Sequence, residues 1–462
     1  MSLLPLAAPA ALFLSALLFL TEGALASRKA PSLRKIHLPL FSLLLLLSLV
    51  PLLFSAPESL FHGQFLWDSL SRCSGLLLGF SALSAMLLLP GYSRKSEVPG
   101  AETAALLFLG NLALLLLSST THLLTALLAL EAFSFITVLL GGILRDRRSS
   151  EGAMKTFFLG LTASLFSLFG LALLFGATGK ADIASLVSLS PSPLLKAGLL
   201  LFLFSFLFKF AMAPLHSWAP DLYQVAPAPL GAYLSTAPKV GIALFLLRLS
   251  PAFTPLLPFL GAFVIVTVLW GNLCALRQED LRRLAAYSSV AHSGYMALAL
   301  LLPSPFRGNA LLFYLTVYVV MNLSLFQALS LLPEGPELSP SLENLKGWGK
   351  DEPWIAGFLA FALLSLAGFP PTPGFLAKAI LFLPALEKGL FLPVGAALLG
   401  TLISVAAYFR LFAPIYFSSG STLKGGDRRG RALLALSSLL LLVLTLWPKG
   451  LTLLIKEVFS HV

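Results

Sequence analysis

Long apolar runs, separated by short polar segments, repeat along the whole chain. A helix that crosses a bilayer needs about 20 mostly apolar residues, and about fourteen runs of this length can be drawn. The predicted spans are 3–26, 37–57, 66–89, 102–120, 123–144, 154–178, 194–216, 228–249, 254–276, 284–302, 308–332, 353–383, 390–417 and 431–455. The pattern therefore predicts an all-α, polytopic membrane protein.

Composition supports the same class. The chain has 462 residues, of which 58% are hydrophobic and 11% charged, and its mean hydropathy is +0.91. The longest connection, 333–352, is rich in Pro, Gly and Glu and reads as a surface connector. We therefore expect residues 1–462 to form a single membrane domain.

The first apolar run resembles a secretory signal, because Ala24-Leu25-Ala26 resembles a cleavage site. No basic residue precedes the run, and its nearest positive charges, from Arg28 to Lys35, follow it. We interpret it as a retained membrane helix.

Positive charges in the connections indicate the orientation. Nineteen Lys and Arg residues lie in or beside the odd-numbered connections, and five lie in or beside the even-numbered ones: Lys180, Lys196, Arg248, Arg307 and Lys388. The positive-inside rule then places the odd connections in the cytoplasm and both termini outside. The net charge of +11 is therefore mostly a signal of membrane topology. No basic patch is interleaved with aromatic residues, so we expect no nucleic-acid partner.

Cofactor sites are not expected in this chain. Its two cysteines, Cys73 and Cys274, are too few for an iron–sulfur cluster. The segment from Gly176 to Lys180 lacks the spacing of a phosphate-binding loop. Redox or nucleotide chemistry, if it drives this protein, belongs to another chain.

Ionisable residues occur inside the predicted spans. Glu131, Lys209 and Lys239 lie within apolar runs, and His292 and Lys378 have similar settings. An ionisable group at the centre of a bilayer costs roughly 2.5–3.5 kcal/mol on insertion scales, so such residues usually serve a function. A structural salt bridge is the alternative for any one of them. The set as a whole favours a pathway for ions.

The first two charges are expected to meet beside a helix break. Ser134 lies one turn beyond Glu131, and burial disfavours the charged carboxylate unless an ammonium is near. Lys209 supplies that ammonium. Pro214 frees the carbonyl of Phe210, so this span is predicted to kink or break, and broken helices at this depth line water or protein.

Polar residues crowd the segment after this predicted break. His216, Trp218 and Asp221 are interpreted either as structural caps or as proton carriers, and the sequence does not separate the two. Pro238 lies directly before Lys239 and, like Pro214, frees a backbone carbonyl, here that of Leu234. A helix end with a lysine that reaches the interface is the alternative, but the largely apolar run 240–247 argues against it.

A polar stripe marks the next two spans. Ser288, His292 and Tyr295 share one helical face, and Tyr314, Tyr318 and Asn322 share another. A single buried histidine is more often a core residue, but the continued stripe favours a relay, and histidine titrates near neutral pH. Span 353–383 contains Pro370 and then Lys378, a second predicted break. Lys209 and Lys378 are thus expected at equivalent positions of two repeats.

Three blocks carry a resemblance to the antiporter-like subunits of respiratory complex I, which are related to subunits of Mrp-type cation/proton antiporters and membrane-bound hydrogenases. The blocks are Phe208-Lys209 with Pro214-Leu215-His216, Trp218, Pro220-Asp221, Tyr223, Pro227 and Pro229; Arg283 with Tyr287 to His292 and Gly294-Tyr295; and Gly368, Pro370, Gly374-Phe375 and Lys378. The likeness covers roughly residues 100–415.

Within that family the chain looks most similar to the N-type subunit (subunit 2). Lys378 stands where the M-type tends to have glutamate, no long lateral helix follows the last span, and the segments 151–155 and 175–179 look N-type. Val225 and Thr156 depart from the usual glycine and tyrosine. The first departure puts the local loop geometry in doubt.

The resemblance implies a fourteen-helix fold in which helices 4–8 and 9–13 are inverted repeats, with helices 7 and 12 broken. The corresponding segments are 1–100, 101–250, 251–417 and 431–455. It also implies that Glu131 pairs with Lys209, that Lys239 is the central carrier, and that Lys378 is the terminal one. We expect supporting roles for Pro214, His216, Asp221, Pro238, Ser288, Tyr295, Tyr318 and Pro370.

The implied function is proton translocation by a non-redox subunit of an NADH:quinone oxidoreductase, coupled to quinone reduction elsewhere. Its partners would be other membrane subunits, including further antiporter-like ones, and the lipid bilayer. FMN, iron–sulfur clusters, NADH and quinone would bind partner subunits. The protein would be a multi-pass protein of the cytoplasmic membrane with both termini on the periplasmic side. The alternatives are a subunit of an Mrp-type antiporter or membrane-bound hydrogenase, and a scaffold without transport.

Overall fold

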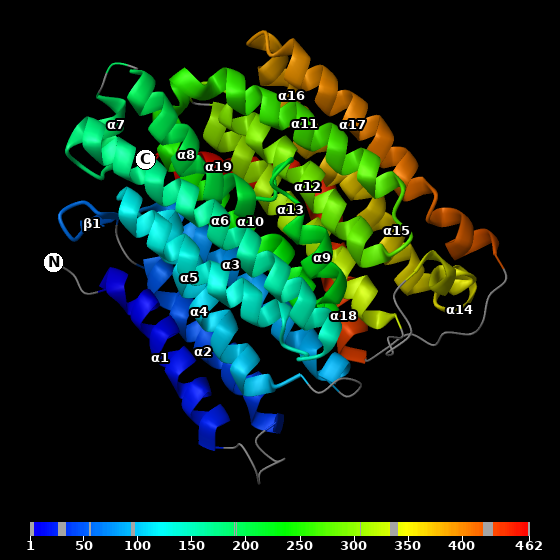
Figure 1. The fold of residues 1–462 in the computed structure, drawn as a ribbon. Helices are drawn as coiled ribbons and strands as arrows, with labels where there is room; N and C mark the ends of the chain where they lie inside the picture. Colours follow the sequence, from blue (N-terminus) through cyan, green and yellow to red (C-terminus); the bar gives the residue numbers. More distant parts are fainter. Residues whose placement is uncertain are drawn as a thin grey trace.

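The structure is a computed structural model that describes residues 4–25, 34–54, 57–93, 98–188, 190, 192–304, 306–332, 341–418 and 428–460. Helices make up nearly all of it, and they pack into one elongated bundle (Figure 1). The connector expected at 333–352 lies partly outside the described residues.

Three helices and a hairpin precede the central part. The helices are α1 (Leu4–Leu25), α2 (Arg34–Phe54) and α3 (Ser69–Ser93). Strands β1 (Glu58–Leu60) and β2 (Phe65–Trp67) pair antiparallel, with Leu60 opposite Phe65. The sequence analysis did not predict this hairpin, because three-residue strands leave no recognisable hydrophobic period.

The next helices contain the first break. They are α4 (Gly100–Ser119), α5 (Leu123–Gly141), α6 (Arg147–Thr178), α7 (Ile183–Val187), α8 (Pro193–Lys209), α9 (Trp218–Val225) and α10 (Ala228–Leu249). The carboxylate of Asp146 accepts a hydrogen bond from the backbone N–H of Ser149 at 2.6 Å and so caps α6. Between α8 and α9 the chain is non-helical, as Pro214 predicts.

The last helices contain the second break. A 3-10 turn (Ser250–Leu256) leads to α11 (Leu257–Leu276), α12 (Leu281–Leu300) and α13 (Phe306–Leu331). After a second 3-10 turn (Leu342–Leu345) follow α14 (Trp348–Asp351), α15 (Pro353–Ala367), α16 (Pro373–Glu387), α17 (Phe391–Phe409), a π-helical turn (Ala413–Phe417), α18 (Arg428–Leu446) and α19 (Pro448–Ser460). The single C-terminal helix expected at 431–455 is two helices, because Pro448 lacks the N–H that would continue α18.

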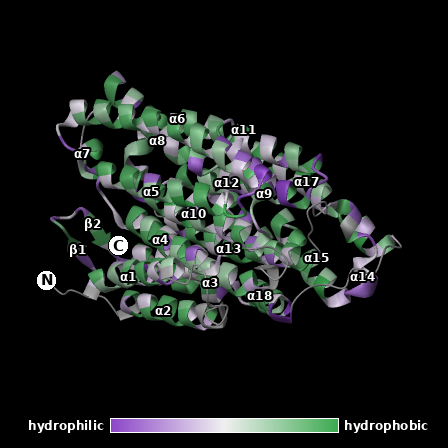
Figure 2. Cartoon of the chain, turned by 60° about the horizontal axis from the view of Figure 1, so that its bottom comes forward, coloured by the Kyte–Doolittle hydropathy of each residue, from purple (hydrophilic) through white to green (hydrophobic). Residues whose placement is uncertain are grey.

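Nine helical segments among the described residues are long and apolar enough to cross a membrane. One of them, 228–276, joins α10 and α11 through the first 3-10 turn, while the interrupted helices α8, α15 and α16 fall below the length required. Figure 2 shows hydrophobic residues along most helices and hydrophilic ones at their connections and near α9. The fold is therefore that of an all-helical membrane protein.

Contacts between connections define two opposite ends of the bundle. We call them the even end and the odd end, after the predicted connections that lie there. At the even end, isolated bridges join Phe65 to Thr120 and His122 to Asp182. At the odd end, a bridge joins Asp280 to Ser341. Consecutive helices thus alternate in direction between the two ends.

Helices α10, α12 and α13 form the centre of the bundle. Nearly every residue of α10 and α12 is buried, including polar ones. Helix α13 contacts α10, α12, α15 and α16. Polar residues on these central helices therefore face protein and not lipid.

Candidate site of buried charged residues

Five ionisable residues lie in the interior of the bundle. The side chains of Lys209, Lys239 and Lys378 are at most 3% exposed, and His292 is 2% exposed. Glu131 is partly buried. They come from α8, α10, α16, α12 and α5 respectively.

Glu131 is held by two serines. Its Oε1 atom accepts a hydrogen bond from Ser164 of α6 at 2.6 Å and another from Ser205 of α8 at 3.3 Å. The sequence analysis missed both serines, because a serine in an apolar helix usually bonds only to its own backbone. Ser134, which lies on the same helix as Glu131, has a buried hydroxyl without a hydrogen-bond partner.

Lys209 is the last residue of α8 and lies directly before the first break. Within the described part of the chain its ammonium has no hydrogen-bond partner. It lies 5.2 Å from the ring centroid of Trp218 and 5.7 Å from that of Phe208, both cation–π distances. The charge of Glu131 acts on it, but no contact within 4.0 Å joins the two groups in this conformation.

Lys239 binds the carbonyl that the first break frees. Its ammonium donates hydrogen bonds to the backbone oxygen of Phe210 and, at 2.6 Å, to the hydroxyl of Ser293. The predicted release of this carbonyl by Pro214 is confirmed. The carbonyl of Leu234, which Pro238 frees, accepts the hydroxyl of Tyr223 at 3.0 Å.

Helix α10 continues through Pro238. It runs from Ala228 to Leu249, and Lys239 is 0% exposed. The alternative of a helix end with an interfacial lysine is therefore wrong. The hydroxyl of Tyr223 on α9 compensates for the lost backbone bond.

The charges of Lys239 and Lys378 both act on His292. Its Nδ1 atom is 2.8 Å from the hydroxyl of Tyr314, and its ring is 5.2 Å from the ring of Tyr318. One turn earlier on α12, two serines also form hydrogen bonds. Ser289 accepts from the Tyr318 hydroxyl at 2.9 Å, and Ser288 shares a hydrogen bond with Tyr408. The residues of the predicted polar stripe are therefore buried and bond to neighbouring helices.

Lys378 binds the end of α15. Its ammonium donates to the backbone oxygen of Ala367 at 2.8 Å and lies 4.6 Å from the ring centroid of Tyr295. Gly368 has φ +77°, and a Cβ there would lie 2.8 Å from Cδ of Lys378. Only glycine both adopts this conformation readily and leaves room for the lysine.

The sequence analysis expected Lys209 and Lys378 at equivalent positions of two repeats. Their positions relative to the helix breaks are different. Lys209 precedes the first break at the end of α8, whereas Lys378 follows the second break and Pro370 within α16. The nearest structural counterpart of Lys209 is Ala367, the last residue of α15, which supplies a carbonyl in place of a charge. Proline spacing alone did not reveal on which side of a break the lysine lies.

The polar residues after the first break divide into two groups. Trp218 donates to the carbonyl of Phe208 at 2.7 Å, and Asp221 pairs with Arg283 at 2.8 Å at the odd end. Trp218 thus bonds to the end of α8, and Asp221 joins α9 to α12, while a role of either residue in proton transfer stays a prediction. His216 accepts from Trp270 at 3.1 Å, and its Nδ1 atom is buried without a hydrogen-bond partner, so a role in proton transfer stays a prediction for His216.

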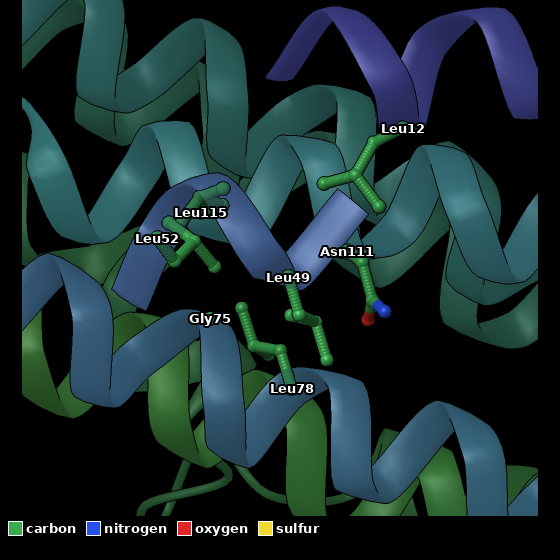
Figure 3. Close-up of a pocket in the computed structure, with 7 residues that line it drawn as sticks. All are labelled: Leu12, Leu49, Leu52, Gly75, Leu78, Asn111 and Leu115. Atoms are coloured by element: carbon green, nitrogen blue, oxygen red, sulfur yellow. The ribbon is translucent and has the colours of Figure 1, made fainter. Parts of the chain in front are cut away.

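The described residues do not offer a metal-binding cluster beside the charged residues. Among the described residues, no group of three or more His, Cys, Asp or Glu side chains could hold a metal ion. A small cavity lies elsewhere, between α1, α2, α3 and α4, and leucines and Asn111 line it (Figure 3).

Comparisons with known proteins agree on one family. Residues 120–404 match the family model described as NADH:quinone oxidoreductase/Mrp antiporter, transmembrane. A curated relative, NADH-quinone oxidoreductase subunit N of Geotalea uraniireducens, is 34% identical over 84% of this chain and 85% of its own. Subunit N 1 of Solidesulfovibrio magneticus is 37% identical over 74% and 75% of the two chains.

Solved structures show the same fold. A chain of respiratory complex I from Thermus thermophilus is 32% identical and superimposes with a TM-score of 0.83 over 96% of this chain and 98% of that one. A chain of the Mrp complex from Dietzia sp. is 19% identical with a TM-score of 0.84, over 99% and 97% of the two chains. At that identity the likeness concerns the fold alone.

Proposed function

Because this chain belongs to the NADH:quinone oxidoreductase/Mrp antiporter family, among its subunit N members, we propose that it translocates protons through its buried row of charged residues. One observation supports this most directly. Glu131, Lys209, Lys239, His292 and Lys378 line the protein interior, and each helix break supplies a backbone carbonyl that binds a lysine. Such residues in a membrane interior are typical of proton relays.

The first step would be a switch at Glu131. While the carboxylate is near Lys209, it stabilises the ammonium. When Glu131 moves away or is protonated, burial favours the neutral lysine, and Lys209 can release its proton. Lys239, as a neutral amine, would accept this proton, since its Nζ atom binds the carbonyl of the residue next to Lys209.

The second half of the path would lead from Lys239 to Lys378. Ser293 bonds to Lys239, and its neighbour His292 bonds to Tyr314. The hydroxyls of Tyr318 and Ser289 lie beside them. His292, which interacts with both lysines, would accept the proton from Lys239 and pass it to Lys378. Ser288 and Tyr295 would orient neighbours of this relay.

Two inverted repeats would contain the two halves. Helices α4, α5, α6, α8 with α9, and α10 correspond in order to α11, α12, α13, α15 with α16, and α17. Contacts within the first set, such as α4 with α10 and α6 with α8, recur in the second as α11 with α17 and α13 with α15. Helix α4 starts at the odd end and α11 at the even end, which is the relation expected of inverted repeats. The chain would then cross the membrane about fourteen times.

We propose that the protein lies in the cytoplasmic membrane with its odd end inside and both termini on the periplasmic side. The asymmetry of positive charges supports this orientation. Its partners would be the other membrane subunits of respiratory complex I, including further antiporter-like subunits. FMN, iron–sulfur clusters, NADH and quinone would bind partner chains.

A second candidate function is cation/proton antiport of the Mrp type, which the shared family model favours. A third is a scaffold that holds the complex together without transport. These candidates predict different responses to ions and to point substitutions.

Proton pumping in inverted membrane vesicles tests the proposal. Lys209→Ala and Glu131→Ala should each lower NADH-driven acidification while the complex still assembles. Exchange of Na⁺ for K⁺ should leave the wild-type rate unchanged, whereas a Na⁺ requirement would favour antiport. Full pumping by both variants would instead support the scaffold.

A further inference from the structure

The carboxylate of Glu131 has two groups of possible partners, which lie beside neighbouring turns of α6. In this conformation it binds Ser164 and Ser205. The ammonium of Lys209 faces the adjacent turn, because a Cβ at Gly160 would lie 4.0 Å from its Nζ atom. Residues 160 and 164 are one turn apart, which is about 5.4 Å along the helix. The two charged groups therefore lie beside neighbouring turns of α6.

The two serines sit on a rigid pair of helices. A Cβ at Gly170 would lie 2.2 Å from the backbone nitrogen of Phe202, so the backbones of α6 and α8 are in close contact. Ser167 reinforces the pair, because its hydroxyl donates to the carbonyl of Phe202 at 2.8 Å and accepts from the N–H of Ser205 at 2.8 Å. Glu131 comes from a different helix, α5, and is only partly buried. The serine hydroxyls are thus held by two closely packed helix backbones, whereas Glu131 reaches them from α5 through a side chain with several rotatable bonds.

Release of the carboxylate leaves Ser164 satisfied. Its hydroxyl lies 2.6 Å from Glu131 and also 2.9 Å from the carbonyl of Gly160. A hydroxyl has one hydrogen to donate, so when Glu131 departs the same hydrogen returns to the backbone. Ser164 therefore keeps a partner, whereas the buried hydroxyl of Ser205 gives up its bond to Glu131, which favours the position of the carboxylate at the serines.

Lys209 attracts the carboxylate from the other side. Its ammonium is buried without a hydrogen-bond partner, and the hydroxyl of Ser134 on α5 is in the same condition. A buried charge is strongly stabilised by an opposite charge at contact distance. The charge of Lys209 and the hydroxyls of the two serines therefore compete for Glu131.

We propose that Ser164 and Ser205 form a second resting position for the Glu131 carboxylate, and that these positioning residues determine how readily the Glu131–Lys209 pair opens. The inference rests on the proposed function, because the opening of this pair is the step that releases the proton of Lys209. The serines stabilise the open state, in which Glu131 binds them, and Lys209 stabilises the closed state, in which Glu131 pairs with it.

Ser164→Ala tests the proposal in the assembled complex. Loss of one hydrogen bond to a charged group shifts an equilibrium by roughly tenfold or more, here toward the closed pair. We expect proton pumping and coupled quinone reduction to fall by a factor of about 3 to 10. Ser205→Ala should have a smaller effect, because its hydrogen bond is longer, and Ser164→Thr should restore most of the rate.

Two controls separate positioning from mere structure. Thr162→Ala removes a hydroxyl of α6 that bonds only to the carbonyl of Phe158, so its rate should equal that of wild type. Ser164→Ala should add nothing in a Glu131→Gln background, because the hydroxyl acts through the carboxylate. The proposal would be overturned if Ser164→Ala slowed pumping equally with and without Glu131. It would also be overturned if assembled Ser164→Ala and Ser205→Ala complexes had the wild-type rate. A wild-type rate in Glu131→Gln alone would overturn the proposed function instead.

Discussion

The ammonium of Lys239 donates a hydrogen bond to the backbone carbonyl of Phe210, the residue that follows Lys209 in the chain. The first helix break thereby connects two charged residues from different helices. Ser293 of α12 donates to the same carbonyl at 2.6 Å, so α12 also reaches this point. The break is the place where both halves of the charged row meet.

Removal of Ser293 should weaken this junction. Ser293→Ala deletes one partner of Lys239 and one donor to the carbonyl of Phe210. A hydrogen bond to a charged group contributes roughly 1.5–3 kcal/mol, so we expect pumping to slow by about tenfold. Ser324→Ala is the matched control, because its buried hydroxyl bonds only to the carbonyl of Val320. Equal rates in the two variants would contradict the assignment.

Gly368 should resist substitution because of Lys378. Gly368→Ala combines a φ of +77° with a Cβ that would lie 2.8 Å from the lysine side chain. The backbone strain alone costs about 1 kcal/mol or more, and displacement of the lysine should lower pumping further. Gly357→Ala on the same helix meets no atom within 4 Å and should be silent. Assembly and pumping, measured for both variants, check the difference.

His292 should be needed for transfer to Lys378 more than for stability. His292→Gln keeps a polar side chain beside Tyr314 but cannot titrate, so the complex should assemble while pumping falls by a factor of about 10 or more. Tyr314→Phe removes the hydroxyl at 2.8 Å from His292 and should slow pumping less. A His292→Gln complex with the wild-type rate would rule out histidine as a carrier.

An ion pair at the even end should stabilise the fold in a pH-dependent way. Arg248 of α10 donates two hydrogen bonds to the carboxylate of Asp68, at 2.6 and 2.8 Å, and both side chains are largely buried. Burial raises the pKa of Asp68, but the hydrogen bond and the charge of Arg248, together with Ser71, outweigh it, so this pKa lies below its ordinary value. The pair therefore stabilises the protein above the unfolded pKa of about 4 and loses this contribution as the pH falls through the folded pKa.

Thermal unfolding of the purified complex checks this prediction. Asp68→Asn leaves Arg248 without its counter-charge and should lower stability by about 3 kcal/mol at neutral pH. The difference in melting temperature between wild type and Asp68→Asn should shrink below about pH 4. A difference that stays constant down to pH 3 would show that the charge of Asp68 is not responsible.

Much of the fold was predictable because proline and apolar length act locally. The carbonyl of Phe210 was expected to be free solely from the position of Pro214, and it binds Lys239. The twofold division of the C-terminal run at Pro448 followed the same rule but was overlooked within an apolar stretch. The hairpin at Glu58–Trp67 gave no signal of its own, since its strands are three residues long.

The contacts of the charged residues were less predictable. Glu131 was expected to contact Lys209, yet Ser164 and Ser205 hold it, because α6 and α8 pack closely enough to present both hydroxyls. Lys378 binds the carbonyl of Ala367, which depends on how α15 and α16 meet across the second break. Such partners depend on tertiary packing, and residue spacing along one helix does not contain that information.

The most direct test of the account is the number of protons pumped per NADH oxidised by vesicles that contain Lys239→Ala. Lys239 lies where the two halves of the row meet, and its removal breaks the path without touching any redox centre. We predict that the complex assembles and that this ratio falls below that of wild type, or that coupled turnover falls at least tenfold. An assembled Lys239→Ala complex with the wild-type ratio and the wild-type rate would contradict the account.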